Sequence, residues 1–128
     1  MFVNRKNMRV KMPTFLIIDD NENDRMLLAA TLKAKGHKIV ELESGRGALA
    51  AVKAHNIDGV ALDLIMPDVE GAETLQLLSQ NYPSLPIVVM SGLGKDYLPM
   101  MEHLGAYAVV EKQADFSEVS YLLERAQI

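Results

Sequence analysis

Short apolar runs alternate with longer amphipathic segments five times between Thr14 and Ile128. The runs are four to six residues long and rich in Val, Ile and Leu, which is typical of strands buried on both faces. They cover residues 14–18, 38–42, 58–62, 85–90 and 107–110. Strands that alternate with helices form a parallel sheet covered by helices, so the pattern predicts a doubly wound α/β fold.

The segments between these strands are predicted to be helices from the spacing of their apolar residues and from their end residues. In the first, about Glu22–Lys35, one stripe holds Leu27, Ala30 and Ala34. Gly36 follows it in the usual position for a helix end. The others are a helix capped by Ser44 that runs to about His55, one with Leu75, Leu78 and Tyr82, a short one capped by Asp96 with Pro99 in its first turn, and a last one with Phe116, Val119, Leu122, Leu123 and Ala126.

Length and composition indicate one soluble domain. The 128 residues suffice for a single core, and 49% hydrophobic with 23% charged residues is typical of globular proteins. No apolar run approaches the ~20 residues that cross a bilayer, so no membrane insertion is expected. The absence of cysteine excludes disulfides and thiolate metal sites and fits a cytoplasmic protein.

The net charge of −4 is unevenly distributed. Four of the 13 basic residues and no acid lie in residues 1–13, which leaves nine basic against 17 acidic residues, or −8, in residues 14–128. We therefore expect a basic, disordered leader at 1–13 and a folded domain at 14–128. Its acidic body argues against direct binding of nucleic acid.

Charged residues follow three of the predicted strands. Asp19 and Asp20 come after the first, Asp63 after the third, and Lys112 after the fifth. Carboxyl ends of parallel strands meet at one edge of the sheet, where ligands bind. Because adjacent carboxylates repel, such a site favours a cation, and hard oxygen ligands suit Mg²⁺. A carboxylate such as Asp63 can also attack phosphorus, while a metal and an ammonium neutralise the transferring group.

Each of these residues has a structural explanation when it is taken alone. An Asp pair after a strand is often a helix cap, and for Asp19 and Asp20 a capping role and a functional role are equally open at this point. Ser91 after the fourth strand is ordinarily a cap, and a lysine such as Lys112 is ordinarily a solvated charge. Their positions after successive strands favour one shared site, in which a hydroxyl and an ammonium reach the same phosphoryl oxygens.

The combined set resembles the receiver domain of two-component response regulators. The matching features are the Asp pair, Asp-x-x-Met-Pro-x-x-x-Gly from Asp63 to Gly71, Ser91-Gly92 and Lys112, and the resemblance covers about Thr14–Ile128. It implies a flavodoxin-like (βα)5 three-layer sandwich, with a five-stranded parallel sheet of order 2-1-3-4-5.

The resemblance also implies roles for the site residues. Asp63 would accept a phosphoryl group from a histidine kinase or phosphotransfer protein in a Mg²⁺-dependent reaction. Asp20 and Asp63 would bind the metal directly, Asp19 through water, and the backbone carbonyl of Ile65 would complete the protein ligands. Ser91 would bond to the phosphoryl group and Lys112 would pair with it. Such a phosphoacceptor is a signalling switch rather than an enzyme.

Implied partners on the output side are a separate downstream protein, an output domain removed from this sequence, or a second copy of the domain. The response would be a population shift in the surface built from the fourth helix, the fifth strand and the fifth helix.

Some positions depart from the family pattern. Gln113 replaces the usual Pro after the lysine, and since a cis bond before a non-proline residue costs about 2.5–4 kcal/mol, we expect a trans peptide. Val109 stands where an aromatic switch residue is common, and Tyr107 lies on the same strand face. Two further positions that tune the lability of the phosphoryl group in this family are apolar here: Ile65, two residues after Asp63, and Leu93, two residues after Ser91. Their bulk would hinder an attacking water, which predicts a long-lived aspartyl phosphate.

Two other functions stay open from the sequence. One is a phosphorylation-independent adaptor with a receiver fold, which Gln113 and Val109 favour and the complete acid set opposes. The other is an aspartate-nucleophile phosphatase, which typically needs a second acid two residues beyond the nucleophile, where Ile65 stands.

Overall fold

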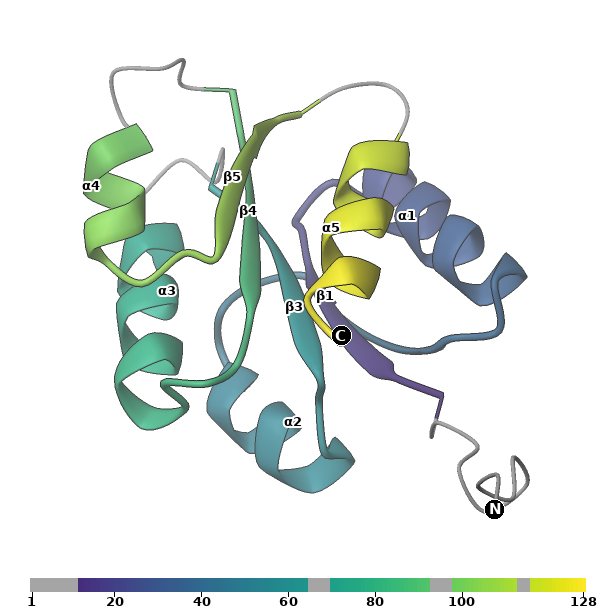
Figure 1. Ribbon diagram of the computed structural model, residues 1–128, viewed down its shortest axis with the longest axis horizontal. Helices are drawn as coiled ribbons and strands as arrows, with labels where there is room; N and C mark the ends of the chain where they lie inside the picture. Colours follow the sequence, from purple (N-terminus) through teal and green to yellow (C-terminus); the bar gives the residue numbers. More distant parts are fainter. Residues whose placement is uncertain (1–11, 65–69, 93–97, 113–115) are drawn as a thin grey trace, which may run out of the picture.

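The computed structural model describes residues 12–64, 70–92, 98–112 and 116–128. Within these ranges five strands form one parallel sheet of order β2-β1-β3-β4-β5, which confirms the predicted order (Figure 1). They are β1 (Thr14–Ile18), β2 (Lys38–Leu42), β3 (Gly59–Asp63), β4 (Ile87–Ser91) and β5 (Ala108–Glu111). Most of the basic leader predicted at 1–13 lies outside the described residues.

Helices cover both faces of the sheet and make three layers, as predicted. In Figure 1, α1 (Glu22–Ala34) and α5 (Ser117–Arg125) lie on one face. The opposite face is covered by α2 (Ala48–His55), α3 (Glu70–Asn81) and α4 (Leu98–His103). None of the helices in the described part of the chain combines the length and apolar character that a bilayer-spanning segment needs.

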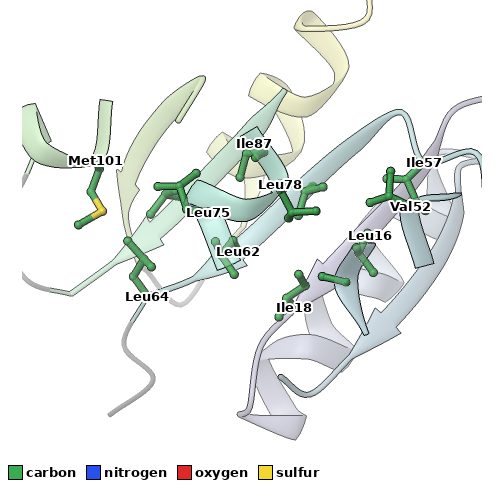
Figure 2. Close-up of a cluster of buried hydrophobic side chains, with 13 residues drawn as sticks. Leu16, Ile18, Val52, Ile57, Leu62, Leu64, Leu75, Leu78, Ile87 and Met101 are labelled. Carbon is green, nitrogen blue, oxygen red and sulfur yellow. The ribbon is translucent and has the colours of Figure 1, made fainter. Parts of the chain in front are cut away.

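Both faces of the central strands are buried because successive side chains alternate between two cores. Phe15 and Ile17 pack under α1 and α5, whereas Leu16 and Ile18 join the core beneath α2, α3 and α4. Figure 2 shows this second core, where Leu75 of α3 lies among the strand residues. Burial of each side chain of this size contributes about 1.5–3 kcal/mol to stability. The sheet is therefore a rigid support for the residues at the carboxyl ends of its strands.

The predicted buried stripe of α1 is wrong. Leu27 is 48% exposed, and Ala30 and Ala34 are exposed too, while the buried residues are Leu28, Ala29 and Leu32. Both stripes have helical spacing, and at 100° per residue a rotation of the helix by roughly 170° exchanges them, so they lie on nearly opposite sides. The stripe that faces the sheet carries two leucines rather than one, so this rotation buries more apolar surface.

The predicted cap of α2 is also wrong. The helix begins at Ala48 after Gly47, which adopts a left-handed conformation at φ +84°. The Ser44 hydroxyl instead accepts a hydrogen bond from the Arg46 backbone N–H at 3.2 Å, within the preceding turn. The end of α1 behaves nearly as expected, since Gly36 follows the cap residue with φ +92°. Asp96, the predicted cap of α4, lies outside the described residues.

Candidate functional site

Three residues singled out from the sequence meet at the carboxyl edge of the sheet. Asp63 is the last residue of β3, Asp19 directly follows β1, and Lys112 directly follows β5. Each stands two positions after a strand residue that packs beneath α1 and α5, so strand parity directs all three toward that side. The Lys112 backbone N–H donates to the Ser91 carbonyl at 3.1 Å and extends the ladder to the site.

The Lys112 ammonium lies at the centre of the site. Its Nζ is 2.9 Å from Asp19 Oδ2, 3.0 Å from Asp63 Oδ2 and 3.0 Å from Asp24 Oδ2. An ammonium has three N–H donors, so these three carboxylates can use all of them. The lysine side chain is only 12% exposed, and those of Asp19 and Asp63 are 1% exposed. Charge-assisted bonds of this length hold Lys112 against both buried acids.

Asp20 completes a group of carboxylates that can hold a metal ion. One carboxylate oxygen from each of Asp19, Asp20 and Asp63 lies within 4.8 Å of the others. Asp20 is exposed while the other two are buried, so the group is open to solvent on one side. Mg²⁺ prefers oxygen ligands, keeps several waters and takes one or two protein carboxylates. The acidic triad is therefore of the type that binds Mg²⁺.

For both Asp19 and Lys112, burial shifts the pKa in one direction and the contact with the opposite charge shifts it in the other. Desolvation raises the pKa of Asp19 to about 6, an effect that Asp63 adds to and that Lys112 and the Asn21 backbone N–H oppose. For Lys112, burial is the largest single influence and lowers its pKa. The bonds to Asp19, Asp24 and Asp63 together outweigh it, so its pKa lies above the ordinary value. Lys112 is therefore charged at any physiological pH.

Asp19 should make the metal-free protein less stable as the pH rises from about 4 to about 6. Its folded pKa of about 6 exceeds the ordinary value of 3.8, so the folded state binds more protons in this window. The contribution lost is about 1–3 kcal/mol. Denaturant unfolding in EDTA should show wild type losing stability relative to Asp19→Asn across this range. A constant difference between the two proteins would contradict the shift.

Two residues that the sequence analysis missed support the site from α1. Asp24 contributes the third carboxylate on Lys112, and Arg25 holds the backbone. The Arg25 Nη1 donates to the Asp19 carbonyl at 2.7 Å, and its Nε lies 3.3 Å from Glu41 Oε1 of β2. An acid in the first turn of a helix ordinarily interacts with the helix dipole, so the sequence around Asp24 gave no indication of its contact with Lys112.

Three other positions named from the sequence, Ser91, Val109 and Tyr107, lie within the described residues. Ser91 ends β4 and is 4% exposed, on the strand face opposite to that of Asp63 and Lys112. Val109 packs against the core beneath α2, α3 and α4, whereas Tyr107 is 48% exposed. The positions of Val109 and Tyr107 do not test whether the surface of α4, β5 and α5 responds to phosphorylation.

The remaining sequence-based predictions fall outside the described residues. They concern Ile65, Leu93 and the Lys112–Gln113 peptide, together with the Met-Pro turn. The long-lived aspartyl phosphate and the trans peptide therefore stay predictions.

The fold and the site define a doubly wound α/β module. Its acidic, metal-binding pocket lies at the carboxyl ends of β1 and β3, where the strand order reverses. Residues 15–124 match the family model described as "Response regulator receiver domain". The chain belongs to this family, so it is a phosphoacceptor signalling module of two-component systems rather than a catalytic enzyme. Membership implies a histidine kinase as partner.

Relatives with known names agree with this assignment. A "Putative response regulator NtrX-like" of Rickettsia typhi is 30% identical over 114 residues, which cover 87% of this chain and 24% of the relative. The "Autoinducer 1 sensor kinase/phosphatase LuxN" of Vibrio campbellii is 33% identical over 93 residues, covering 72% of this chain and 11% of that protein. The chain thus spans about a quarter or less of the length of these relatives.

Solved structures show the same fold. The response regulator TrrA of Thermotoga maritima, in complex with Mg²⁺-BeF, superposes with a TM-score of 0.79 at 27% identity, covering 90% of this chain and 99% of that one. The "BeF3 Activated DrrB Receiver Domain" gives a TM-score of 0.80 at 18% identity, covering 91% and 98%. The second likeness shows the fold alone.

Proposed function

We propose that Asp63 accepts a phosphoryl group in this receiver and that Lys112, Ser91 and the other acids serve that reaction. A carboxylate oxygen of Asp63 attacks phosphorus, the bond from phosphorus to the donor's leaving group breaks, and an acyl phosphate forms. The observation that carries this is the Lys112 Nζ, which lies 3.0 Å from Asp63 Oδ2, where Asp63 is buried and the lysine side chain is only 12% exposed. An ammonium in that place opposes the negative charge that gathers on the phosphoryl oxygens.

The proposed metal ligands are Asp20 and Asp63 directly, Asp19 through water, and the backbone carbonyl of Ile65. Support comes from the oxygens of the three acids, which lie within 4.8 Å of one another. A bound Mg²⁺ would supply positive charge to the phosphoryl oxygens. In this proposal Lys112 pairs with the phosphoryl group and the Ser91 hydroxyl donates a hydrogen bond to it.

We further propose that residues 14–128 form the receiver unit, which a histidine kinase or phosphotransfer protein phosphorylates in the cytoplasm. The family supports the kinase as the source of the phosphoryl group. The relatives it matches are four or more times longer than the matched part. For output we propose a downstream protein, an output domain of a longer chain, or a second copy of this domain.

Acetyl phosphate tests the proposal directly. With Mg²⁺ present, intact-mass spectrometry should show one added phosphoryl group per chain, and the same incubation in EDTA should leave the mass unchanged. Because an acyl phosphate is a mixed anhydride, mild alkali should remove the label. If neither acetyl phosphate nor another small donor modifies the protein, and beryllofluoride with Mg²⁺ causes no change in its NMR spectrum, the phosphorylation-independent adaptor is the better description.

A further inference from the structure

Asp24 is a fourth carboxylate at the site and stands outside the acidic triad. It lies in the first turn of α1, and its side chain is 36% exposed. Its Oδ2 is 3.0 Å from the Lys112 Nζ, as close as that of Asp63. Asp24 therefore competes for the same ammonium without being needed to bind a metal.

The position of Asp24 is fixed by the start of its helix. The Asn21 side chain caps α1 by accepting a hydrogen bond from the Asp24 backbone N–H at 2.9 Å. The next residue, Arg25, bonds to the Asp19 carbonyl at 2.7 Å and ties the same turn to the end of β1. Asp24 is thus held at the rim of the pocket by local structure rather than by its ion pair with Lys112.

We propose that Asp24 is a positioning residue for Lys112 that sets how the site divides its affinity between a divalent cation and a phosphoryl group. The inference rests on the proposed function of Asp63 as acceptor. With Asp24 in place, one N–H of the ammonium points away from the triad, and its positive charge is partly neutralised from the α1 side. A cation at the triad meets less repulsion, and an anion on Asp63 meets less attraction.

The two effects have opposite signs, which separates this role from a structural one. Removing the Asp24 charge makes the electrostatic potential at the triad more positive, because the Lys112 charge is no longer partly neutralised. Cation binding at the triad therefore weakens and anion binding on Asp63 strengthens. A variant that merely loosened the start of α1 would disturb Asp19 and Lys112 together and weaken both. The direction of the two changes, rather than the size of either, identifies the mechanism.

Asp24→Asn is the variant that tests the proposal, and Glu22→Gln is its matched control. Both remove one acid from the first turn of α1, so both lose the same favourable interaction with the helix dipole. Glu22 is exposed at the start of the helix, two residues before the acid that contacts Lys112. Asp24→Glu keeps the charge and should restore wild-type behaviour in part.

The measurements are Mg²⁺ affinity by calorimetry and, at saturating Mg²⁺, beryllofluoride affinity and the rate of labelling by acetyl phosphate. In Asp24→Asn we expect Mg²⁺ to bind roughly three- to tenfold more weakly, and beryllofluoride to bind more tightly by a similar factor, for one charge removed at this range in a partly exposed site. Labelling should accelerate, and Glu22→Gln should match wild type in all three.

Every other result overturns the inference or its basis. If Asp24→Asn equals wild type, or weakens the binding of both ions, Asp24 does not divide the affinity as proposed. If wild type itself binds no beryllofluoride and takes no label, the proposed function fails first, and that outcome is separate from a failure confined to the Asp24 variants.

Discussion

Asp63→Asn is expected to abolish labelling by acetyl phosphate while the protein keeps its fold. The amide has the shape of the carboxylate, but its oxygen is no nucleophile toward phosphorus at neutral pH. Asp63 is buried beside Asp19, and the change removes one of three like charges held next to Lys112. The free energy of unfolding should therefore stay the same or rise. Intact-mass spectrometry measures the label, and denaturant unfolding measures the stability.

Glu73→Gln is the control for that experiment. Glu73 lies on α3 and is exposed, so its substitution makes the same chemical change away from the pocket. It should be labelled as fast as wild type. If Asp63→Asn still accepted one phosphoryl group per chain, the acceptor would be another acid of the pocket, and Asp19→Asn would be the next variant to examine.

Lys112→Met should destabilise the metal-free protein and make its stability depend strongly on Mg²⁺. Methionine replaces the aliphatic stem but leaves Asp19, Asp24 and Asp63 without their shared ammonium. Leaving buried acids unpaired is costly, and we expect a loss of about 2–4 kcal/mol near pH 8 in EDTA. Added Mg²⁺ should recover most of it, because a cation then neutralises the same carboxylates.

The pH dependence of Lys112→Met has a definite sign. Loss of the ammonium removes a contact that lowers the pKa of Asp19, so that pKa should rise above its present value of about 6. The folded variant then holds this proton to a higher pH, so the defect should shrink as the pH falls from about 8 to about 6, where Asp19 of the wild type becomes protonated too. Lys53→Met, which changes an exposed lysine of α2, should show none of these effects. A defect of equal size at every pH would mean that packing, rather than charge, is responsible.

The strand pattern was sufficient to predict the sheet and the place of the site. Runs such as Phe15–Ile18 are apolar at every position because both faces are covered, and that character is local to the sequence. The positions of Asp19, Asp63 and Lys112 could be predicted from this pattern, since charged residues that end such runs lie at the edge of the sheet. The sheet order came instead from the family resemblance, and the structure confirms it.

Helix orientation could not be predicted in the same way. The two apolar stripes of α1 lie on nearly opposite sides of the helix, and only docking on the sheet shows that Leu28 and Leu32 are buried while Leu27 is exposed. The same docking directs Asp24 toward Lys112, 88 positions later in the chain. No local pattern contains that contact.

The sequence by itself therefore determined the five strand–helix units, the residues at the strand ends, and the chemistry that Asp19, Asp20, Asp63 and Lys112 can perform. The tertiary structure decided how strongly each acid is buried and which of them share the ammonium. The physical reason is that desolvation and ion pairing depend on everything packed around a charge. The environment of these charges is formed by α1, β1, β3 and β5, which come together only when the sheet forms.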